Sequence, residues 1–239
     1  MLIYGFHPVR EALRHRPQEL QRVLISDRRQ GKRRREIESL SRRHRLELRI
    51  TPEAELSRLV DGLHNGFAAE LRQPTAPGPH GEADPQFVVL LEDIQDPRNL
   101  GALLRVCEGA GVGRVLIRDR GTAPVSPAVV KTAAGATEWL AIERITNTAN
   151  EVARMKKEGF WVYGADAQGD PPWEADLTGP IVLCFGGEEK GLRARTRKIC
   201  DRFLGLPMRG RIEALNVSAA AAALIYEALR QRLKADSRL

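Results

Sequence analysis

Six short apolar runs, separated by segments of helical periodicity, constrain the fold of residues 87–206 more than any other feature. Continuous apolar runs of this kind are typical of strands that are buried on both faces of a parallel sheet. Their regular alternation with helices predicts an α/β fold with helices on both faces of that sheet. The predicted strands are Phe87–Leu91, Val115–Ile117, Leu140–Ile142, Trp161–Tyr163, Ile181–Phe185 and Phe203–Leu206.

A proline-rich stretch at residues 73–85 divides the chain. Its four prolines and two glycines cannot continue a helix or a central strand, so it predicts a semi-rigid linker. We expect a domain over residues 1–72 before it and a second domain over residues 86–239. The first domain is predicted to be a small α/β unit with helices over His7–Arg14, Lys32–Arg45 and Pro52–Leu59 and strands over Arg22–Ile25, Glu47–Ile50 and Phe67–Leu71.

Positive charge is concentrated at the start of the chain. Residues 1–50 hold 14 Arg or Lys against 6 Asp or Glu, although the net charge of the whole chain is only +7. A basic face most often meets a polyphosphate backbone, and a solvated basic surface is the alternative. Arg35, Arg42 and Arg45 fall close to one face of the predicted helix. The candidate residues for contact with such a backbone are Arg28, Arg29, Lys32, Arg33, Arg34 and Arg35.

The few cysteines and the short apolar stretches bear on where the protein resides. The three cysteines show no paired spacing and lie near no histidine cluster, which favours a reducing compartment and argues against a structural metal. The N-terminus is too poor in apolar residues for a signal peptide, and Leu215–Tyr226 is too short to cross a bilayer. We therefore expect a cytoplasmic protein with no metal and no membrane partner.

In parallel sheets ligands bind beyond the carboxyl ends of the strands, so the loops after Leu91, Phe185 and Leu206 are the candidate site. The first loop opens an amphipathic helix, in which Asn99 takes the predicted N-cap position. Arg105 lies at the edge of the buried stripe of this helix, and its side chain leans back toward that loop. An ordinary cap and a surface arginine also explain these two residues.

The second and third loops carry further unusual residues. Gly186 and Gly187 follow a strand and let the backbone approach a ligand closely, and the acidic residues after them suit a hydroxyl, an amine or a cationic centre. The spacing matches neither the dinucleotide fingerprint nor a P-loop. In the third loop, Asn216 and Ser218 stand at the start of an Ala-rich helix, where capping is the alternative explanation.

Together and in this order, the three loops resemble the motifs of the SpoU (TrmH-type) RNA 2′-O-ribose methyltransferases of the SPOUT superfamily. The likeness covers about 150 residues, from Phe87 to Leu233. The matching stretches are Asp96–Gly101 with Arg105, Lys131–Glu138, Gly186–Leu192, Leu206–Met208 and Leu215–Ser218. Gly5–Leu13 and His64–Ala68 resemble the N-terminal RNA-binding domain of the branch that methylates a guanosine of 23S ribosomal RNA.

The resemblance implies a small N-terminal domain similar to a ribosomal-protein fold and a C-terminal trefoil knot. It also implies S-adenosylmethionine as the methyl donor, ribosomal RNA as the substrate and a homodimer with the site close to the interface. The cofactor contacts that it implies fall at Gly186, Leu206, Met208 and Leu215.

Methyl transfer to a ribose hydroxyl requires alignment of an already activated methyl group and handling of the hydroxyl proton. We expect Arg105 to stabilise the developing alkoxide or to grip a neighbouring phosphate, because guanidinium stays protonated in proteins. Asn99 and Asn216 would orient the hydroxyl and the loops, and Glu188 would position a loop or Arg105. The sequence departs from the family at Ala133 and Ala214, where serine is usual, so neither position is given a catalytic role.

Three other functions remain open at this point. The same chemistry on a transfer RNA guanosine is the first alternative. A non-catalytic RNA-binding or ribosome-assembly protein is the second, although the presence of all four candidate catalytic residues counts against it. A nicotinamide-dependent oxidoreductase is the most distant, since the fingerprint glycines are absent.

Overall fold

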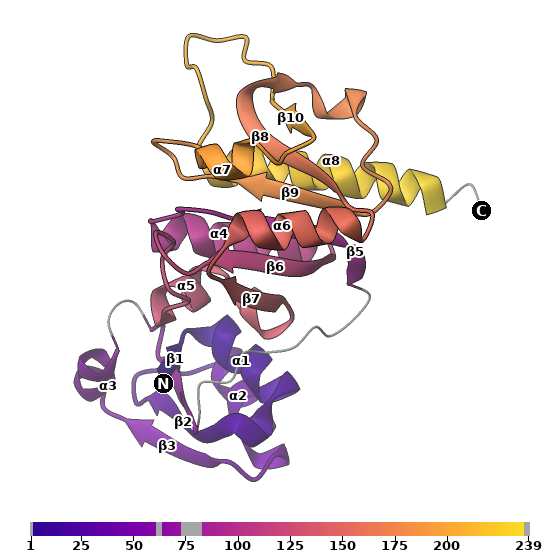
Figure 1. Cartoon of the computed structure of the whole chain (residues 1–239). Helices are drawn as coiled ribbons and strands as arrows, with labels where there is room; N and C mark the ends of the chain where they lie inside the picture. The colour runs from indigo at the N-terminus through magenta and orange to yellow at the C-terminus, as the bar shows by residue number, and fades with distance from the viewer. Residues whose placement is uncertain (1, 61–63, 73–82, 237–239) are drawn as a thin grey trace.

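The computed structural model describes residues 2–60, 64–72 and 83–236, which fold into two α/β units (Figure 1). The N-terminal unit, drawn in indigo and purple, holds a four-stranded sheet, and the C-terminal unit holds a six-stranded sheet. Residues 73–82, which are most of the predicted linker, lie outside the described residues. The first strand of the larger sheet begins at Asp84 and thus takes in the end of the predicted linker.

The larger sheet is wholly parallel, as the apolar runs predict. Its strands stand in the order β10-β8-β9-β5-β6-β7. Each predicted run contributes one of these strands, whose bounds are β5 (Asp84–Leu91), β6 (Val112–Arg118), β7 (Ala141–Ile145), β8 (Trp161–Asp170), β9 (Ile181–Phe185) and β10 (Arg202–Leu204). The edge strand β7 is half-exposed, so the prediction that every run is buried is wrong there.

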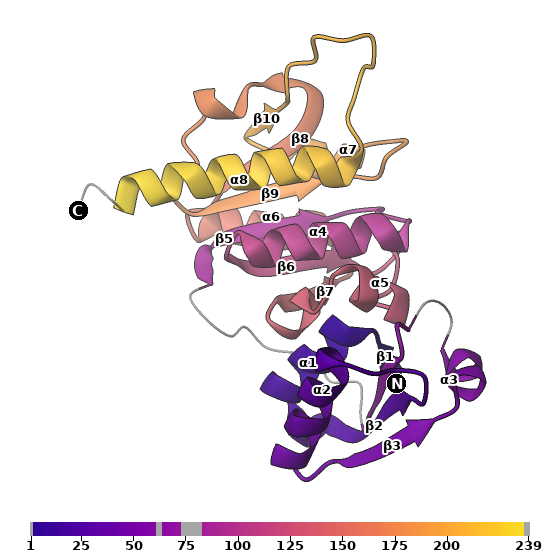
Figure 2. The same ribbon diagram turned by 180° about the vertical axis from the view of Figure 1, so that it is seen from behind.

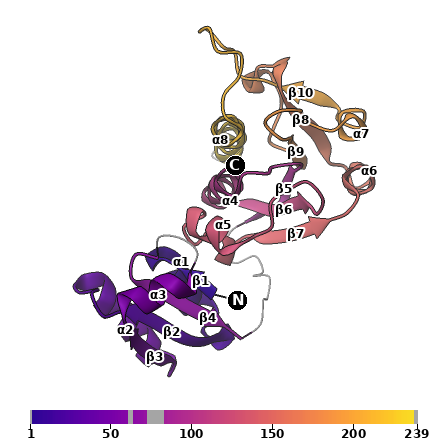
Figure 3. The same cartoon turned by 90° about the vertical axis from the view of Figure 1, so that its left-hand side faces the viewer.

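Helices cover both faces of this sheet (Figure 3). On one face lie α4 (Pro97–Gly109), α5 (Pro127–Thr132) and α8 (Val217–Asp236), and on the other lie α6 (Thr148–Lys157) and α7 (Ala194–Arg197). Successive residues of β5 point to opposite faces. Val89 and Leu91 pack in the core with α4 and α8, whereas Val88 and Leu90 pack in the core with α6. This two-sided burial explains why the strand is apolar throughout.

The direction in which strands are added reverses between β5 and β9. From β5 the chain adds β6 and β7 on one side, and it then builds β8, β9 and β10 on the other. In open parallel sheets such a reversal opens a crevice where ligands bind. The loops after β5 and β9 meet at this point, because the backbone N–H of Glu92 donates to the carbonyl of Phe185 at 2.9 Å.

The N-terminal unit is a smaller sheet with strand order β1-β4-β2-β3 and helices on both faces (Figure 2). Its elements are β1 (Leu2–Tyr4), α1 (Phe6–His15), β2 (Leu20–Ser26), α2 (Lys32–Arg43), β3 (Glu47–Thr51), α3 (Glu53–Leu59) and β4 (Phe67–Leu71). The three predicted helices and three predicted strands are confirmed, and β1 is too short for a sequence pattern to reveal.

One detail of this unit differs from the prediction. Helix α2 ends at Arg43, and Arg45 takes a left-handed backbone conformation with φ 54°. Arg45 therefore does not share a helix face with Arg35 and Arg42.

The two units pack together through α1 and the segment Lys131–Glu138. The buried guanidinium of Arg16 makes a bidentate contact with the carboxylate of Glu138, in which Nη2 lies 2.6 Å from Oε1. Gly135 has φ 100°, and a Cβ at this position would lie 2.7 Å from Cγ of Glu11. The segment Lys131–Glu138, which resembles a SpoU motif, thus forms part of the contact between the two units.

Candidate active site

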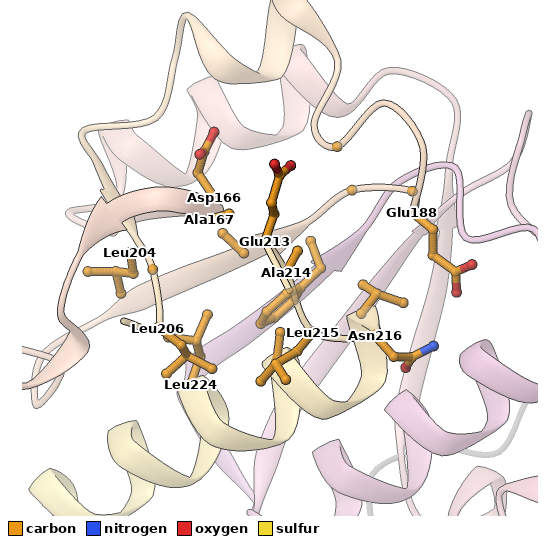
Figure 4. Close-up of a pocket in the computed structure, with 18 of the residues that line it drawn as sticks. Asp166, Ala167, Glu188, Leu204, Leu206, Glu213, Ala214, Leu215, Asn216 and Leu224 are labelled. Atoms are coloured by element: carbon orange, nitrogen blue, oxygen red, sulfur yellow. The ribbon is translucent and has the colours of Figure 1, made fainter. Parts of the chain in front are cut away.

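Loops from the sheet's carboxyl edge enclose a cavity of about 460 Å³ (Figure 4). Three of its walls are residues 185–191 after β9, residues 204–208 at the end of β10 and residues 213–217 before α8. The fourth wall is formed by residues 165–167 of β8. The four predicted cofactor-binding residues all line this cavity: Gly186, Leu206, Met208 and Leu215.

The cavity is apolar on one side and acidic on the other. Figure 4 shows Leu206, Leu215 and Leu224 gathered beside the first turns of α8. The carboxylates of Asp166 and Glu213 stand on the opposite side. Such a lining suits a ligand that combines a flat apolar group with a positive charge.

Glycines allow the loops to pack backbone against backbone. A Cβ at Gly186 would lie 2.0 Å from the carbonyl carbon of Gly191, and a Cβ at Gly205 would lie 2.5 Å from the carbonyl oxygen of Asp166. Gly191 itself has φ 59°, a left-handed conformation that side chains disfavour. The walls of the cavity are therefore fixed by main-chain contacts that larger residues would break.

A chain of side-chain hydrogen bonds joins the three motif loops. Asn99 donates from Nδ2 to Oε1 of Glu188, and its own Oδ1 accepts from Nδ2 of Asn216 at 3.2 Å. Oδ1 of Asn216 accepts from the backbone N–H of Ser218 at 2.9 Å and from its hydroxyl at 2.6 Å. Three of the four predicted catalytic residues are thus in direct contact, although they lie up to 117 residues apart in the sequence.

The predicted cap at Asn99 is wrong. The cap of α4 is Asp96, whose carboxylate accepts from the backbone N–H of Arg98 at 2.7 Å, and Pro97 fills the first helical position. Asn99 therefore lies within the first turn, where its amide is free to join Glu188 and Asn216. Asn216 does cap α8, so in its case the structural and the functional explanations hold together.

The sequence patterns miss Asp166, which belongs to the acidic side of the cavity. Strand β8 runs on to Asp170, well past the apolar run that ends at Tyr163. The sequence pattern misses this extension because residues 164–170 hold no large apolar side chain. Hydrogen bonds from the backbone N–H of Gln168 and from Arg197 hold the pKa of Asp166 below its usual value. Asp166 is therefore ionised at neutral pH, and Arg197, which also lines the cavity, is its counter-charge.

Arg105 does not join the other candidate catalytic residues. It is exposed on α4 and is not among the described residues that line the cavity. Its charge acts instead on His7 of the N-terminal unit, whose pKa is lowered by burial and by Arg10, Arg33 and Arg105. Within one chain, the predicted contact between Glu188 and Arg105 is therefore replaced by the contact between Glu188 and Asn99.

The structure separates the six candidate RNA-binding residues into two groups. Arg34 is half-buried and pairs with Glu38 at 2.7 Å, and Arg29 packs against Gly66 with its guanidinium 5.6 Å from the Phe67 ring centre. These two residues support the fold. The other four have exposed side chains on or before α2: Arg28, Lys32, Arg33 and Arg35.

In residues 2–60, 64–72 and 83–236, no group of three or more His, Cys, Asp or Glu side chains is placed to hold a metal ion. No helix within this part of the chain combines the length and the apolar character that crossing a membrane requires.

This arrangement of fold and site is that of a SpoU methyltransferase, and the sequence comparison identifies the family. The sequence model of the SpoU rRNA methylase family matches residues 86–226, so the chain belongs to that family. The model for the RNA 2′-O ribose methyltransferase substrate-binding domain matches residues 2–77.

Curated relatives and solved structures agree with this assignment. The chain is 33% identical over 238 residues to 23S rRNA (guanosine-2′-O-)-methyltransferase RlmB of Pseudomonas putida, covering 96% of each chain. It is 30% identical to the enzyme of that name from Escherichia coli, covering 97% of this chain and 98% of the relative. The SpoU methyltransferase AviRb of Streptomyces viridochromogenes, crystallised with the cofactor AdoMet, has a TM-score of 0.80 at 26% identity over 98% of this chain and 90% of that chain.

A transfer RNA enzyme of the same family matches less of the chain. The TrmH/SpoU tRNA modifying enzyme of A. aeolicus has a TM-score of 0.59 at 26% identity and covers 65% of this chain and 79% of its own. The RlmB relatives, in contrast, match nearly the full length. The family assignment establishes an RNA 2′-O-methyltransferase.

Proposed function

We propose that this protein transfers a methyl group from S-adenosylmethionine to the 2′-hydroxyl of a guanosine in 23S ribosomal RNA. The observation that carries this proposal is the contact chain Glu188–Asn99–Asn216 beside a cavity at the point where the strand order reverses. The near full-length similarity to RlmB supports 23S ribosomal RNA, rather than transfer RNA, as the substrate.

The residues that line the cavity fit S-adenosylmethionine. Its volume of about 460 Å³ lies within the range of small-molecule sites, which is roughly 300–1,000 Å³. Leu206, Met208 and Leu215 offer an apolar surface for an adenine ring, and the backbone at Gly186 is open to close approach. The Glu213 carboxylate at the cavity is compatible with the positive charges of the donor, whereas Asp166 is already paired with Arg197. When bound, the donor supplies a methyl group already activated by a sulfonium.

The remaining work falls on side chains of this protein. Asn99 and Asn216 hold fixed amide orientations because each is bonded on both sides, so they present a defined surface to the ribose hydroxyl. Glu188 holds Asn99 in place. Arg105 stabilises the negative charge that develops on the ribose oxygen or contacts the adjacent phosphate, and it does not act as a base because guanidinium stays protonated.

The position of Arg105 supports a homodimer in which this residue reaches the cavity of a second copy. Arg105 is exposed on α4, which packs beside α8 (Figure 2). The outer face of α8 carries Ala219, Ala223 and Tyr226, and the Tyr226 side chain is 48% exposed. Small and aromatic residues on one exposed helix face suit packing against a second copy of the chain.

The N-terminal unit supplies the contact with RNA in this proposal. Four exposed cations can contact phosphate groups without recognising a specific base: Arg28, Lys32, Arg33 and Arg35. Ala133 is buried and so offers nothing to a substrate. Ala214 lines the cavity but has no hydroxyl, so a catalytic role stays with the four residues named above.

Further features follow from the family. We infer a trefoil knot formed by the loops at Gly186 and Leu206, domain limits at residues 1–72 and 86–239 with the linker between them, and a cytoplasmic location. The match of separate sequence models to residues 2–77 and 86–226 supports the domain limits. The similarity to ribosomal RNA methyltransferases supports the location.

The test is to incubate the protein with labelled S-adenosylmethionine and with unmodified 23S ribosomal RNA or transfer RNA, and to map the methylated ribose. We expect one guanosine of 23S ribosomal RNA to be labelled and transfer RNA to remain unlabelled. Labelling of transfer RNA alone would establish the alternative substrate. Failure to bind S-adenosylmethionine in calorimetry would instead favour a non-catalytic RNA-binding protein.

A further inference from the structure

A second cavity of about 470 Å³ lies on the other side of the loop that follows β9. The two cavities share Gly187, Glu188 and Lys190 as a common wall. The second cavity is lined mainly by charged side chains from the ends of β5 and β6 and from residues 187–193, whereas the first is largely apolar. The charged residues of the second cavity are Asp93, Asp96, Arg118, Arg120, Glu188, Glu189, Lys190 and Arg193.

Asp93 organises this cavity. Its carboxylate accepts from Arg118 at 2.9 Å and from Arg193 at 3.1 Å, so both arginines are held by one anion. A Cβ at Gly187 would lie 2.5 Å from the carbonyl oxygen of Asp93, so the backbone of the shared wall packs directly against Asp93.

The loop that carries Arg120 is held in place by the same contacts. Arg118 also donates to the carbonyl oxygen of Arg120. Gly121, the next residue, has φ 93°, and a Cβ there would lie 2.1 Å from Oδ1 of Asp93. The backbone at Arg120 is therefore held in one conformation, which fixes the point from which its side chain extends.

Two cations of this cavity have no protein partner. Arg120 and Lys190 are exposed and, in the part of the chain that the structure describes, form no hydrogen bond or ion pair through their side chains. Arg118 and Arg193 are already committed to Asp93. The cations of the cavity that remain able to meet an anion are therefore these two side chains. Glu189, which is also exposed, forms no side-chain hydrogen bond or ion pair within the described residues either, so the cavity holds one unpaired carboxylate beside the two unpaired cations.

We propose that the second cavity binds the target nucleotide and that Arg120, assisted by Lys190, holds its 3′-phosphate. This inference rests on the proposed function. The accepting 2′-oxygen must approach the methyl group to about 3–3.5 Å, so the accepting ribose has to lie at a wall that both cavities share. The ribose C3′, which is bonded to the carbon that bears the 2′-hydroxyl, carries the 3′-phosphate. This phosphate therefore lies close to that wall. Arginine is the side chain best suited to such a phosphate.

The test is a double-mutant cycle between Arg120 and one phosphate. Arg120→Ala is compared with the wild type on a ribosomal RNA fragment that contains the mapped guanosine, with either a natural 3′-phosphate or a neutral formacetal linkage at that place. With the wild type, we expect the formacetal to lower kcat/KM about 10-fold or more, as for the loss of a charge-assisted hydrogen bond. With Arg120→Ala, we expect a similar loss on the natural fragment and no further loss with the formacetal.

Arg195→Ala is the matched control, because Arg195 is exposed on α7 and lines neither of the two cavities described. It should leave the effect of the formacetal unchanged. Affinity for S-adenosylmethionine and the melting temperature of Arg120→Ala should equal those of the wild type, which separates the proposed role from a loss of folding.

Three outcomes would count against the inference. Additive losses in the cycle would show that Arg120 does not contact this phosphate. A selective change in preference between guanosine and inosine would make Arg120 a reader of the base. A wild type that binds S-adenosylmethionine but methylates no RNA would overturn the proposed function itself, and this inference with it.

Discussion

The carboxyl edge of the larger sheet and the basic surface of the N-terminal unit use charge in different ways. At the edge of the sheet, polar side chains are bonded to one another, as in Asn99–Glu188 and Arg118–Asp93. On α2, Lys32 and Arg35 extend into solvent. Bonded side chains hold a fixed geometry, which transfer chemistry needs, whereas unbonded cations provide sequence-independent attraction to phosphates. This difference fits the proposed function, in which one unit positions the reacting groups and the other binds the RNA.

A buried ion pair joins the basic N-terminal unit to the unit that holds the cavity. Arg16 and Glu138 are buried, come from different units and lie 122 residues apart. A fixed contact of this kind holds the basic surface in one orientation relative to the cavity, as the proposed function requires if RNA on α2 is to reach the loops.

The largest expected effect comes from breaking that contact. Arg16→Met leaves the carboxylate of Glu138 buried without its counter-charge, and breaking one side of a buried ion pair costs about 3–5 kcal/mol. We expect a clear fall in the free energy of unfolding, measured by urea denaturation with circular dichroism. The control is Arg22→Met, which breaks the partly exposed Arg22–Glu70 pair and should cost about 0–1 kcal/mol. Equal effects of the two variants would contradict the assigned role of the buried pair.

The second effect concerns chemistry at the edge of the sheet. Arg105→Ala should lower the single-turnover methylation rate roughly 10²–10³-fold, because a stabiliser of developing negative charge is lost. Arg105→Lys should retain part of the rate, and both variants should bind S-adenosylmethionine normally. Normal methylation by both variants would remove Arg105 from the catalytic set.

Mixing of variants decides whether Arg105 acts on its own chain or on a second copy. Ala220 lines the first cavity, so Ala220→Trp should fill it and abolish cofactor binding. If Arg105 serves a second copy, reassembled mixtures of Arg105→Ala and Ala220→Trp should regain about a quarter of wild-type activity, since half of the dimers hold one intact site. Complete inactivity of the mixture would place Arg105 in its own chain's site.

A smaller effect is expected at the basic surface. Replacing Lys32, Arg33 and Arg35 with Gln should weaken RNA binding and reduce the slope of log affinity against log salt by about 0.7–0.9 for each phosphate that the protein no longer neutralises. The measurement is fluorescence anisotropy over a salt series. Arg154→Gln on α6 is the control, because this exposed arginine is paired with Glu151 and Glu158. An unchanged slope in the triple variant would mean that α2 is an ordinary solvated face.

The smallest effect is a pH dependence at the junction of the two units. Burial and the charges of Arg10, Arg33 and Arg105 lower the pKa of His7, so His7 is neutral at pH 7 in the free protein. RNA phosphates favour the protonated form, so binding takes up a proton and affinity should rise as the pH falls from about 7.5 to 5.5, by less than about 10-fold.

The same shift has the opposite sign for folding. Because the pKa of His7 is lower in the folded than in the unfolded protein, its contribution to stability is present above pH 6.5 and is lost as the pH falls through the folded pKa.

His7→Asn should remove the pH dependence of RNA affinity, and His44→Asn on the same unit should preserve it. A pH dependence that persists in His7→Asn would assign it to another group.

The loops that carry the site were predictable, because they follow continuous apolar runs and the carboxyl ends of parallel strands meet at one edge. The individual contacts at Gly186, Leu206, Met208 and Leu215 came from the resemblance to the SpoU family, and all four residues line the cavity. Asp166 was not predictable in this way, because the second half of β8 has no apolar pattern and is assigned to a strand by its pairing with β10.

Other details depend on contacts between distant parts of the chain. Asn99 is a residue type that helix caps favour, and it precedes the apolar periodicity of α4. Asp96 is the cap instead, so the Asn99 amide bonds to Glu188. Arg105 lies near Asn99 in sequence, yet it is exposed and acts electrostatically on His7 of the other unit. Neither outcome can be read from spacing, since both depend on which neighbouring element is packed against α4.

The sequence by itself determined the parallel α/β architecture, the division of the chain and the loops that hold the chemistry, because periodicity and glycine or proline placement act locally. Only the tertiary structure decided that Arg16 meets Glu138, that Asp93 builds a second cavity around Arg118 and Arg193, and that Arg105 stands apart from Asn99. Those arrangements arise from packing between elements far apart in the chain, where hydrogen-bonding geometry and burial select one set of partners from many that the composition allows.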